Sequence, residues 1–277
     1  MITGFKTQHS TASVMNLFNY GGFFATGVAG FVKAFQMVTF GFIGIELIGV
    51  TASETQKPQM TIPKAINEIP LRVILFYVGS MLALICIYPW NQIPADQSPF
   101  VQVFKLIGVP AAAGIINFVV LTAAASACNS SIFSTSRMLF SLSRGRQSSL
   151  AKKLSHLSRR QVPANSILFS TAVIGIVVIA NFVFPNTILF SFIASVATTC
   201  FLFIWAMIIC AHLKCCKQTK LPFKKSRRPI TDYLVLGFLL FVAWVMCLDK
   251  MTLIALLAAV IWLLVLWLLS SVTIQAG

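Results

Sequence analysis

The 277-residue chain is 58% apolar and only 10% charged, whereas a soluble domain carries roughly 25% charged residues. This composition excludes a single water-soluble core, because so much apolar surface has to face lipid. The formal net charge of +15 suggests nucleic acid at first, but Lys and Arg lie between the apolar runs and hardly at all within them. Charge in those places is typical of loops that meet anionic lipid headgroups, so membrane lipids are expected partners and nucleic acid is not.

The apolar runs predict transmembrane helices, because about 20 apolar residues in a helix span the hydrocarbon layer. They are continuous and lack the alternation of a membrane β-barrel. We therefore predict an all-α, polytopic helical membrane protein with seven transmembrane helices. The seven runs cover residues 30–50, 73–88, 107–127, 167–184, 187–213, 233–248 and 251–274.

The basic residues predict the orientation of these helices. Of the 21 Lys and Arg, 17 fall in three segments, 57–72, 137–160 and 214–228, which alternate with the runs as loops on one side should. The positive-inside rule places these segments in the cytoplasm and the N-terminus outside. The first 28 residues hold no compact apolar run behind a basic start, so no cleavable signal peptide is predicted. An outside N-terminus of this kind leads us to expect that further helices precede the chain.

The first run contains the sharpest polar feature. Gly41, Gly44 and Gly49 lie inside it, and Glu46 is flanked by apolar residues at membrane depth. A carboxylate left ionised in lipid would cost about 2.5–3.5 kcal/mol on insertion scales for Asp. Glu46 is therefore predicted either to gate or carry a proton, or to be a neutral acid bonded to a neighbouring helix. The glycines allow two interpretations, close helix packing or a break in the helix.

A broken helix would join these residues into a mechanism. Transporters often unwind a spanning helix at mid-membrane, and the freed carbonyl oxygens then bind charged groups of the ligand. An unwound segment at residues 40–44 would offer the carbonyls of Phe40, Gly41 and Ile43 to an ammonium group. Phe40 would close over the site as a lid.

Polar residues in later runs are weaker candidates. Ser126, Asn129 and Ser130 lie three and four residues apart and share a helix face. That face is expected either to bind a substrate or to hydrogen-bond another helix. The same two interpretations apply to Ser191, Ser195, Thr198 and Thr199.

Other motifs are few. The loop at residues 61–68 predicts a short interfacial helix, with Thr61 as its cap and Pro63 in its first turn. The seven cysteines have neither metal-like nor disulfide-framework spacing. Lipase, zinc-protease and phosphate-loop motifs are missing from the sequence. We therefore expect no enzyme, no catalytic residues, no metal site and no cofactor.

At this point the sequence resembles a known family, the bacterial amino acid permeases of the amino acid–polyamine–organocation superfamily. The similarity is to the amino acid transporter branch that includes the D-serine/D-alanine/glycine permeases. Three stretches carry it: residues 40–46 with the following 50–58 and 62–66, residues 112–124, and residues 128–130 with 134–139. The first motif with its loop is the most specific, and the match runs from about Phe18 to Leu213.

The resemblance implies proton-coupled import of neutral or small amino acids across the bacterial plasma (inner) membrane. It implies a five-plus-five inverted-repeat fold, in which the seven runs correspond to helices six to twelve. The domains would be an extracellular segment 1–28, a second repeat 29–213, a basic cytoplasmic loop 214–230 and two C-terminal helices 231–277. Ser130 and Ser131 would lie near the side-chain pocket, Ser195 near the wall formed by the tenth helix, and Glu46 at the cytoplasmic gate. The candidate substrate-binding residues are then Phe40, Gly41, Phe42, Ile43, Gly44, Asn129, Ser130, Ser131 and Ser195.

The sequence departs from the family pattern in one large respect, because the first five helices and their own broken segment have no counterpart. We therefore expect a C-terminal fragment that is inactive without an N-terminal half of five helices. The alternative function is a non-transporting membrane scaffold or interaction subunit that keeps the permease fold.

Overall fold

A computed structural model of the chain describes residues 12–50, 55–93, 98–106, 110–183, 187–217 and 229–275. Within these ranges every regular element is a helix and none is a strand, which confirms the all-α prediction. The chain divides into two compact units. The first comprises Met1–Thr26 with Glu46–Ala172, and the second comprises Gly27–Ile45 with Val173–Gly277.

Among the described residues, five helices have the length and composition to cross a bilayer. They are Pro58–Ile87, Gly114–Ser143, Ala164–Val183, Leu189–Cys216 and Lys250–Leu269. A shorter apolar helix, Ile230–Met246, occupies the sixth predicted run, and the first predicted run is divided into two short helices. Large apolar side chains face outward on these helices, as Phe182 does with 85% exposure. Such surface suits lipid and not water.

The first unit begins with α1 (Asn16–Asn19) and η1 (Gly22–Phe24), which are joined to the end of α5 (Gly79–Ile87). The Asn16 side-chain amide donates to the Cys86 carbonyl at 3.0 Å. The Trp90 indole, in η4 (Trp90–Gln92), donates to the Tyr20 carbonyl at 3.1 Å. The helix ends because Pro89 forces Tyr88 into an extended conformation.

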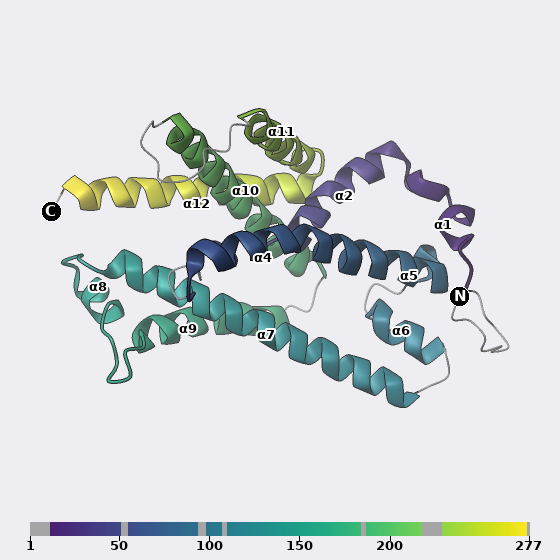
Figure 1. The fold of residues 1–277 in the computed structure, drawn as a ribbon, viewed down its shortest axis with the longest axis horizontal. Helices are drawn as coiled ribbons and strands as arrows, with labels where there is room; N and C mark the ends of the chain where they lie inside the picture. The colour runs from purple at the N-terminus through teal and green to yellow at the C-terminus, as the bar shows by residue number, and fades with distance from the viewer. Residues whose placement is uncertain are drawn as a thin grey trace. The chain divides into compact units, whose positions relative to one another are not determined.

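A long helix follows in the first unit, and it corrects the prediction for residues 61–68. No separate interfacial helix forms there, because α4 (Pro58–Val73) continues through η3 (Ile74–Val78) into α5 as one rod (Figure 1). Pro58 sits at the first helical position, where a missing N–H costs nothing. Thr61 is therefore inside the helix, and its hydroxyl donates to the Gln56 carbonyl at 3.1 Å. The η3 segment is one wide π-turn, and a single turn within an α-helix is the usual form of this rare helix type.

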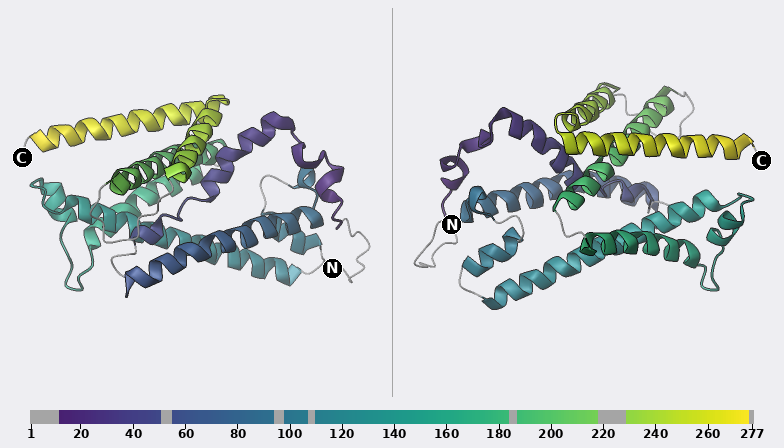
Figure 2. Two further views of the ribbon diagram at one scale, coloured as in Figure 1. Left: turned by 45° about the horizontal axis from the view of Figure 1, so that its top comes forward. Right: turned by 180° about the vertical axis from the view of Figure 1, so that it is seen from behind.

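The rest of the first unit is α6 (Pro99–Leu106), α7 (Pro110–Ser143), α8 (Ser149–Leu154) and the start of α9 (Ala164–Val183). Figure 2 shows α7 as a long unbroken helix in both views. This helix continues beyond residue 127, where the third predicted run ends, into a polar stretch that reaches Ser143.

The second unit packs α2 (Gly27–Gly41), α10 (Thr187–Lys217), α11 (Pro229–Met246) and α12 (Lys250–Gln275) together. Its core consists of Leu202 from α10 with Leu239, Val242 and Met246 from α11. On α12, Ala255 and Ala259 are fully buried. Small residues of this kind let helix backbones approach closely in a membrane.

One ion pair and one histidine–carboxylate contact in the second unit agree with the sides assigned from charge. The Lys33 ammonium lies 3.8 Å from the Asp249 carboxylate, in the turn between α11 and α12. His212, near the end of α10, lies 3.0 Å from Asp232, at the start of α11. Lys33 and Asp249 both lie toward the side opposite the basic segments, whereas His212 and Asp232 both lie next to the basic segment 214–228. Both are partly exposed, so neither stabilises the fold by much.

Candidate functional site

The first predicted run contains a break in the helix. The α2 helix ends at Gly41, residues 42–46 form turns, and α3 (Leu47–Val50) then begins. The last turn of α2 tightens, because the Phe42 N–H donates to the Thr39 carbonyl at 3.1 Å and the Ile43 N–H to the Phe40 carbonyl at 3.2 Å. Gly44 then adopts φ +111°, a conformation that side chains disfavour. The helix-break interpretation of the glycines is therefore confirmed as backbone geometry.

Glu46 is the last residue of the break. It is half-buried, and its carbonyl accepts a hydrogen bond from the Gly49 N–H at 2.9 Å, which starts α3. Glu46 directly precedes α3 and is the one acid within this apolar stretch of sequence.

A buried polar contact joins α2 to α10 in the second unit. The Gln36 amide nitrogen donates to the Ser195 hydroxyl at 3.1 Å, and that hydroxyl donates to the Ser191 carbonyl at 2.7 Å. Gln36 and Ser195 are only 7% and 3% exposed. Ser195 therefore lies in an interhelical hydrogen bond, the second of its two predicted interpretations. Gln36 was missed at the sequence level, although an amide within an apolar run was a visible signal.

The Phe40 ring, predicted as a lid, packs within the second unit. It lies edge-on to Phe190 of α10, with ring centroids 6.3 Å apart and planes 88° apart. Edge-to-face pairs are favourable beyond the area they bury. The end of α2 at the break is thus held against α10 by one aromatic contact and, one turn earlier, by Gln36.

Two further polar residues of α10 are bonded within their own helix. The Thr198 hydroxyl donates to the Ala194 carbonyl at 2.8 Å, and the Thr199 hydroxyl donates to the Ser195 carbonyl at 3.0 Å. Both side chains are buried. Local bonds of this kind satisfy a hydroxyl without a ligand.

A hollow of about 590 Å³ lies in the first unit. It is bordered by Leu47 and Ile48 of α3, by the polar end of α7 and by the residues around the start of α9. Asn129 and Ser130 line it, so two of the predicted binding residues lie beside the segment that follows Glu46. Its α7 wall also includes Arg137, whose guanidinium stacks 4.4 Å from the Phe133 ring centroid and adds positive charge.

Ser131 and Ser126 differ from their neighbours. Ser131 is exposed and does not line this hollow, and its carbonyl accepts the Thr135 hydroxyl at 2.7 Å. The Ser126 carbonyl accepts the Ser130 hydroxyl at 3.0 Å, so the face shared by Ser126, Asn129 and Ser130 is partly bonded to itself. Within the described ranges, no three His, Cys, Asp or Glu side chains gather as metal ligands would.

The apolar helices, the broken helix and the polar end of α7 define a class, that of multi-pass helical membrane proteins. The family model for amino acid permeases matches residues 1–275, and the chain belongs to that family. No solved structure matches the chain.

Curated relatives agree with this assignment. The chain is 45% identical to the amino-acid permease AapA of Bacillus subtilis, over 99% of this chain and 60% of that protein. It is 40% identical to the D-serine/D-alanine/glycine transporter of Escherichia coli K12, over 92% of this chain and 55% of the relative. It is also 40% identical to the DL-alanine permease SerP2 of Lactococcus lactis, over 94% of this chain and 57% of that permease. The chain thus spans less than two thirds of the length of these relatives.

Proposed function

We propose that this chain forms part of an amino acid importer of the bacterial plasma membrane, which moves small neutral amino acids inward together with protons. Membership of the permease family supports the transport of amino acids. The names of two relatives, a D-serine/D-alanine/glycine transporter and a DL-alanine permease, support small neutral substrates. Because the chain matches 55–60% of three such relatives, transport is proposed for an assembly that also holds the unmatched portion of a permease.

The observation that carries this proposal is the break between α2 and α3. A carbonyl oxygen has two lone pairs, so a bond within the turn, such as that from Ile43 N–H to Phe40, leaves capacity for a second donor. We assign the carbonyls of Phe40, Gly41 and Ile43 to the substrate ammonium. Phe42 and Gly44 shape the turn, and Phe40 closes over the ligand.

The remaining predicted residues receive separate roles. Asn129 and Ser130 offer an amide and a hydroxyl at the hollow of the first unit, and Ser131 would act near the substrate side chain. Ser195 would form the edge of the site on α10 while its hydroxyl accepts the hydrogen bond from the Gln36 amide. Glu46, half-buried and next to the break, would take up and release the coupled proton.

The proposal extends to architecture. The helices would correspond to helices six to twelve of a five-plus-five inverted-repeat transporter, with residues 29–213 as the second repeat. In this scheme α2 and α3 together make one span, interrupted at residues 42–46, and α11 makes another. A helix divided in this way is too short in each half to qualify as a span by length alone.

Uptake measurements test the transport proposal. We would co-express the chain with the portion of AapA that it does not match, in cells that lack their own alanine and glycine permeases, and measure uptake of radiolabelled D-alanine and glycine. The expected result is uptake with both parts and none with either part alone. If both parts reach the membrane and co-purify without uptake or binding, the transport proposal is wrong and the scaffold alternative is favoured.

Proton coupling needs its own measurement. In the active assembly, Glu46→Gln should flatten the dependence of uptake on external pH, because the amide cannot exchange a proton. Glu68→Gln is the matched control, since the Glu68 carboxylate is exposed and pairs with Arg72 at 3.0 Å. An unchanged pH profile for Glu46→Gln would remove this residue from the coupling step.

A further inference from the structure

The segment between α7 and α9 is a built surface and not a loose loop. Its short helix α8 is anchored by Ala151 and Leu154, both 7% exposed. The Asn165 side chain donates to the Lys153 carbonyl at 2.7 Å, and the buried Ser166 hydroxyl donates to the Leu154 carbonyl at 2.8 Å. These bonds satisfy carbonyls that a helix end leaves unpaired. They hold α8 in a fixed place against the start of α9.

This segment carries positive charge without acids of its own. Residues 137–160 contain seven Lys and Arg, and no Asp or Glu occurs between Asp96 and Asp232. Among the described residues of the first unit, the acids are Glu46 and Glu68, and Glu68 already pairs with Arg72. The seven cations therefore lie on a stretch of chain that holds no acid, which favours the approach of an external anion.

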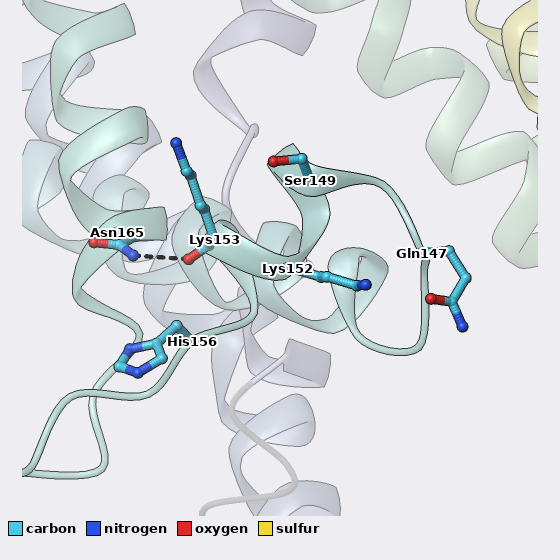
Figure 3. A pocket seen from close by; sticks show the side chains of 6 residues that line it. All are labelled: Gln147, Ser149, Lys152, Lys153, His156 and Asn165. Atoms are coloured by element: carbon cyan, nitrogen blue, oxygen red, sulfur yellow. Dashed lines mark hydrogen bonds between the residues drawn. The ribbon is translucent and has the colours of Figure 1, made fainter.

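A hollow of about 570 Å³ lies at α8, lined by Gln147, Ser149, Lys152, Lys153, His156 and Asn165. In Figure 3 the Lys152 side chain extends toward the loop that holds Gln147, whereas Lys153 extends from a different side of the helix. The two ammonium groups thus flank α8. Ammonium, amide and hydroxyl groups are the donors that phosphate oxygens accept from.

Apolar side chains stand beside these cations. Leu150 is 61% exposed and Leu157 is 37% exposed, and in the sequence they flank the stretch that holds Lys152, Lys153 and His156. Exposed leucines among lysines are typical of segments that lie in the membrane interface. The positive-inside rule also places this segment on the cytoplasmic side. A ligand that suits both kinds of group has an anionic head and an apolar tail.

From these features we infer that the α8 surface binds the phosphate group of an anionic phospholipid in the cytoplasmic leaflet. Lys152 contacts the phosphate, Lys153 adds positive charge from the other side of α8, and Leu150 and Leu157 contact the upper acyl chains. The inference does not depend on transport, because none of these residues belongs to the proposed substrate site.

The test uses the full chain in detergent, with lipid binding followed by native mass spectrometry. The probes are phosphatidylglycerol, phosphatidylcholine and inorganic phosphate. The chain should bind phosphatidylglycerol more tightly than phosphatidylcholine, and Lys152→Gln with Lys153→Gln should weaken that binding on the order of tenfold. The matched control is Lys57→Gln with Lys64→Gln, which removes the same charge from exposed lysines of the same unit and should leave binding unchanged.

Three results would overturn the inference: equal binding of the two lipids, equal loss in the control variant, or tight binding of inorganic phosphate, which would mark a site for free phosphate. If the Gln variant does not fold, two other measurements test the inference. They are lipid binding by the variant Lys152→Arg with Lys153→Arg, and the salt dependence of lipid binding by the unmodified chain. The Arg variant should keep its preference, and binding by the unmodified chain should weaken as salt screens the charges.

Discussion

The two units treat their polar side chains differently. In the second unit, Gln36, Ser195 and Thr198 are buried and bonded to one another or to their own helices. In the first unit, Asn129 and Ser130 are exposed at a hollow. Polar groups inside a helix pair stabilise that pair, whereas polar groups on an exposed face of an apolar helix need a ligand, water or another helix.

This comparison separates structural polar residues from residues available for function. The α2 and α10 helices are joined by one amide–hydroxyl bond and one aromatic pair close to the break, so we expect them to behave as one body. By the same reasoning, the polar end of α7 is where substrate contacts should be sought. Four experiments test this contrast, in order of decreasing effect.

The largest effect is expected from Met246→Ala, which opens a cavity in the second unit. Met246 is fully buried, and loss of its side chain should destabilise the fold by about 2–5 kcal/mol. Met138→Ala in the first unit is the control, because Met138 is 50% exposed and should change stability by less than about 0.5 kcal/mol. Thermal unfolding in detergent measures both. Equal losses would show that the two units do not differ in packing.

Gly44→Ala comes next. Its cost should be about 1–3 kcal/mol, because alanine does not readily adopt φ +111°. A new methyl group would meet no atom within 4 Å, so the effect is one of backbone strain and not of collision. Gly49→Ala is the control, since Gly49 is helical, has equal space and a φ that alanine accepts. Unfolding of both variants in detergent gives the comparison, and a harmless Gly44→Ala would contradict the turn described at residues 42–46.

A smaller effect is expected from the contact between Gln36 and Ser195. A double-mutant cycle with Gln36→Leu and Ser195→Ala should give a coupling energy of about 0.6 kcal/mol, with about 1.7 as an upper value for such bonds in membranes. The cycle is measured by unfolding in detergent. A coupling of zero would mean that the two side chains act independently. Ser130→Ala serves as the uncoupled control when paired with Gln36→Leu, because the Ser130 hydroxyl bonds to the Ser126 carbonyl of its own helix.

The smallest change in stability is expected from Ser130→Cys, and here the measured quantity is accessibility. In a background without the seven native cysteines, a thiol at position 130 should react rapidly with a water-soluble thiol reagent. A thiol at position 195, where the native side chain is 3% exposed, should react more slowly by on the order of tenfold or more. Similar rates would remove the distinction between the two units.

Much of the fold followed from the sequence for a clear physical reason. Continuous apolar runs have one stable form in a membrane, the helix, so the described long helices fall near their predicted positions. The break was one of two interpretations that Gly41 and Gly44 allowed beside Glu46 in an apolar run, and the structure selects it.

Other features depend on contacts that a single run does not reveal. Residues 61–68 looked like a separate interfacial helix because Thr61 suits a cap and Pro63 a first turn, yet α4 begins at Pro58 and contains both residues. The partner of Gln36 lies 159 residues away in sequence, so the amide was visible but its bond was not. Ser195 was expected at a binding wall or between helices, and only its neighbours in space distinguish these positions.

The wide turn at Ile74–Val78 has a geometric consequence for the helix that contains it. A π-turn adds one residue to a helical repeat, and each residue of an α-helix turns the chain by about 100°. Side chains of residues 58–73 are therefore rotated relative to those of residues 79–87, compared with a regular helix of the same sequence. Deleting one residue from this turn would realign the two halves, so that one continuous stripe of side chains ran along the whole rod.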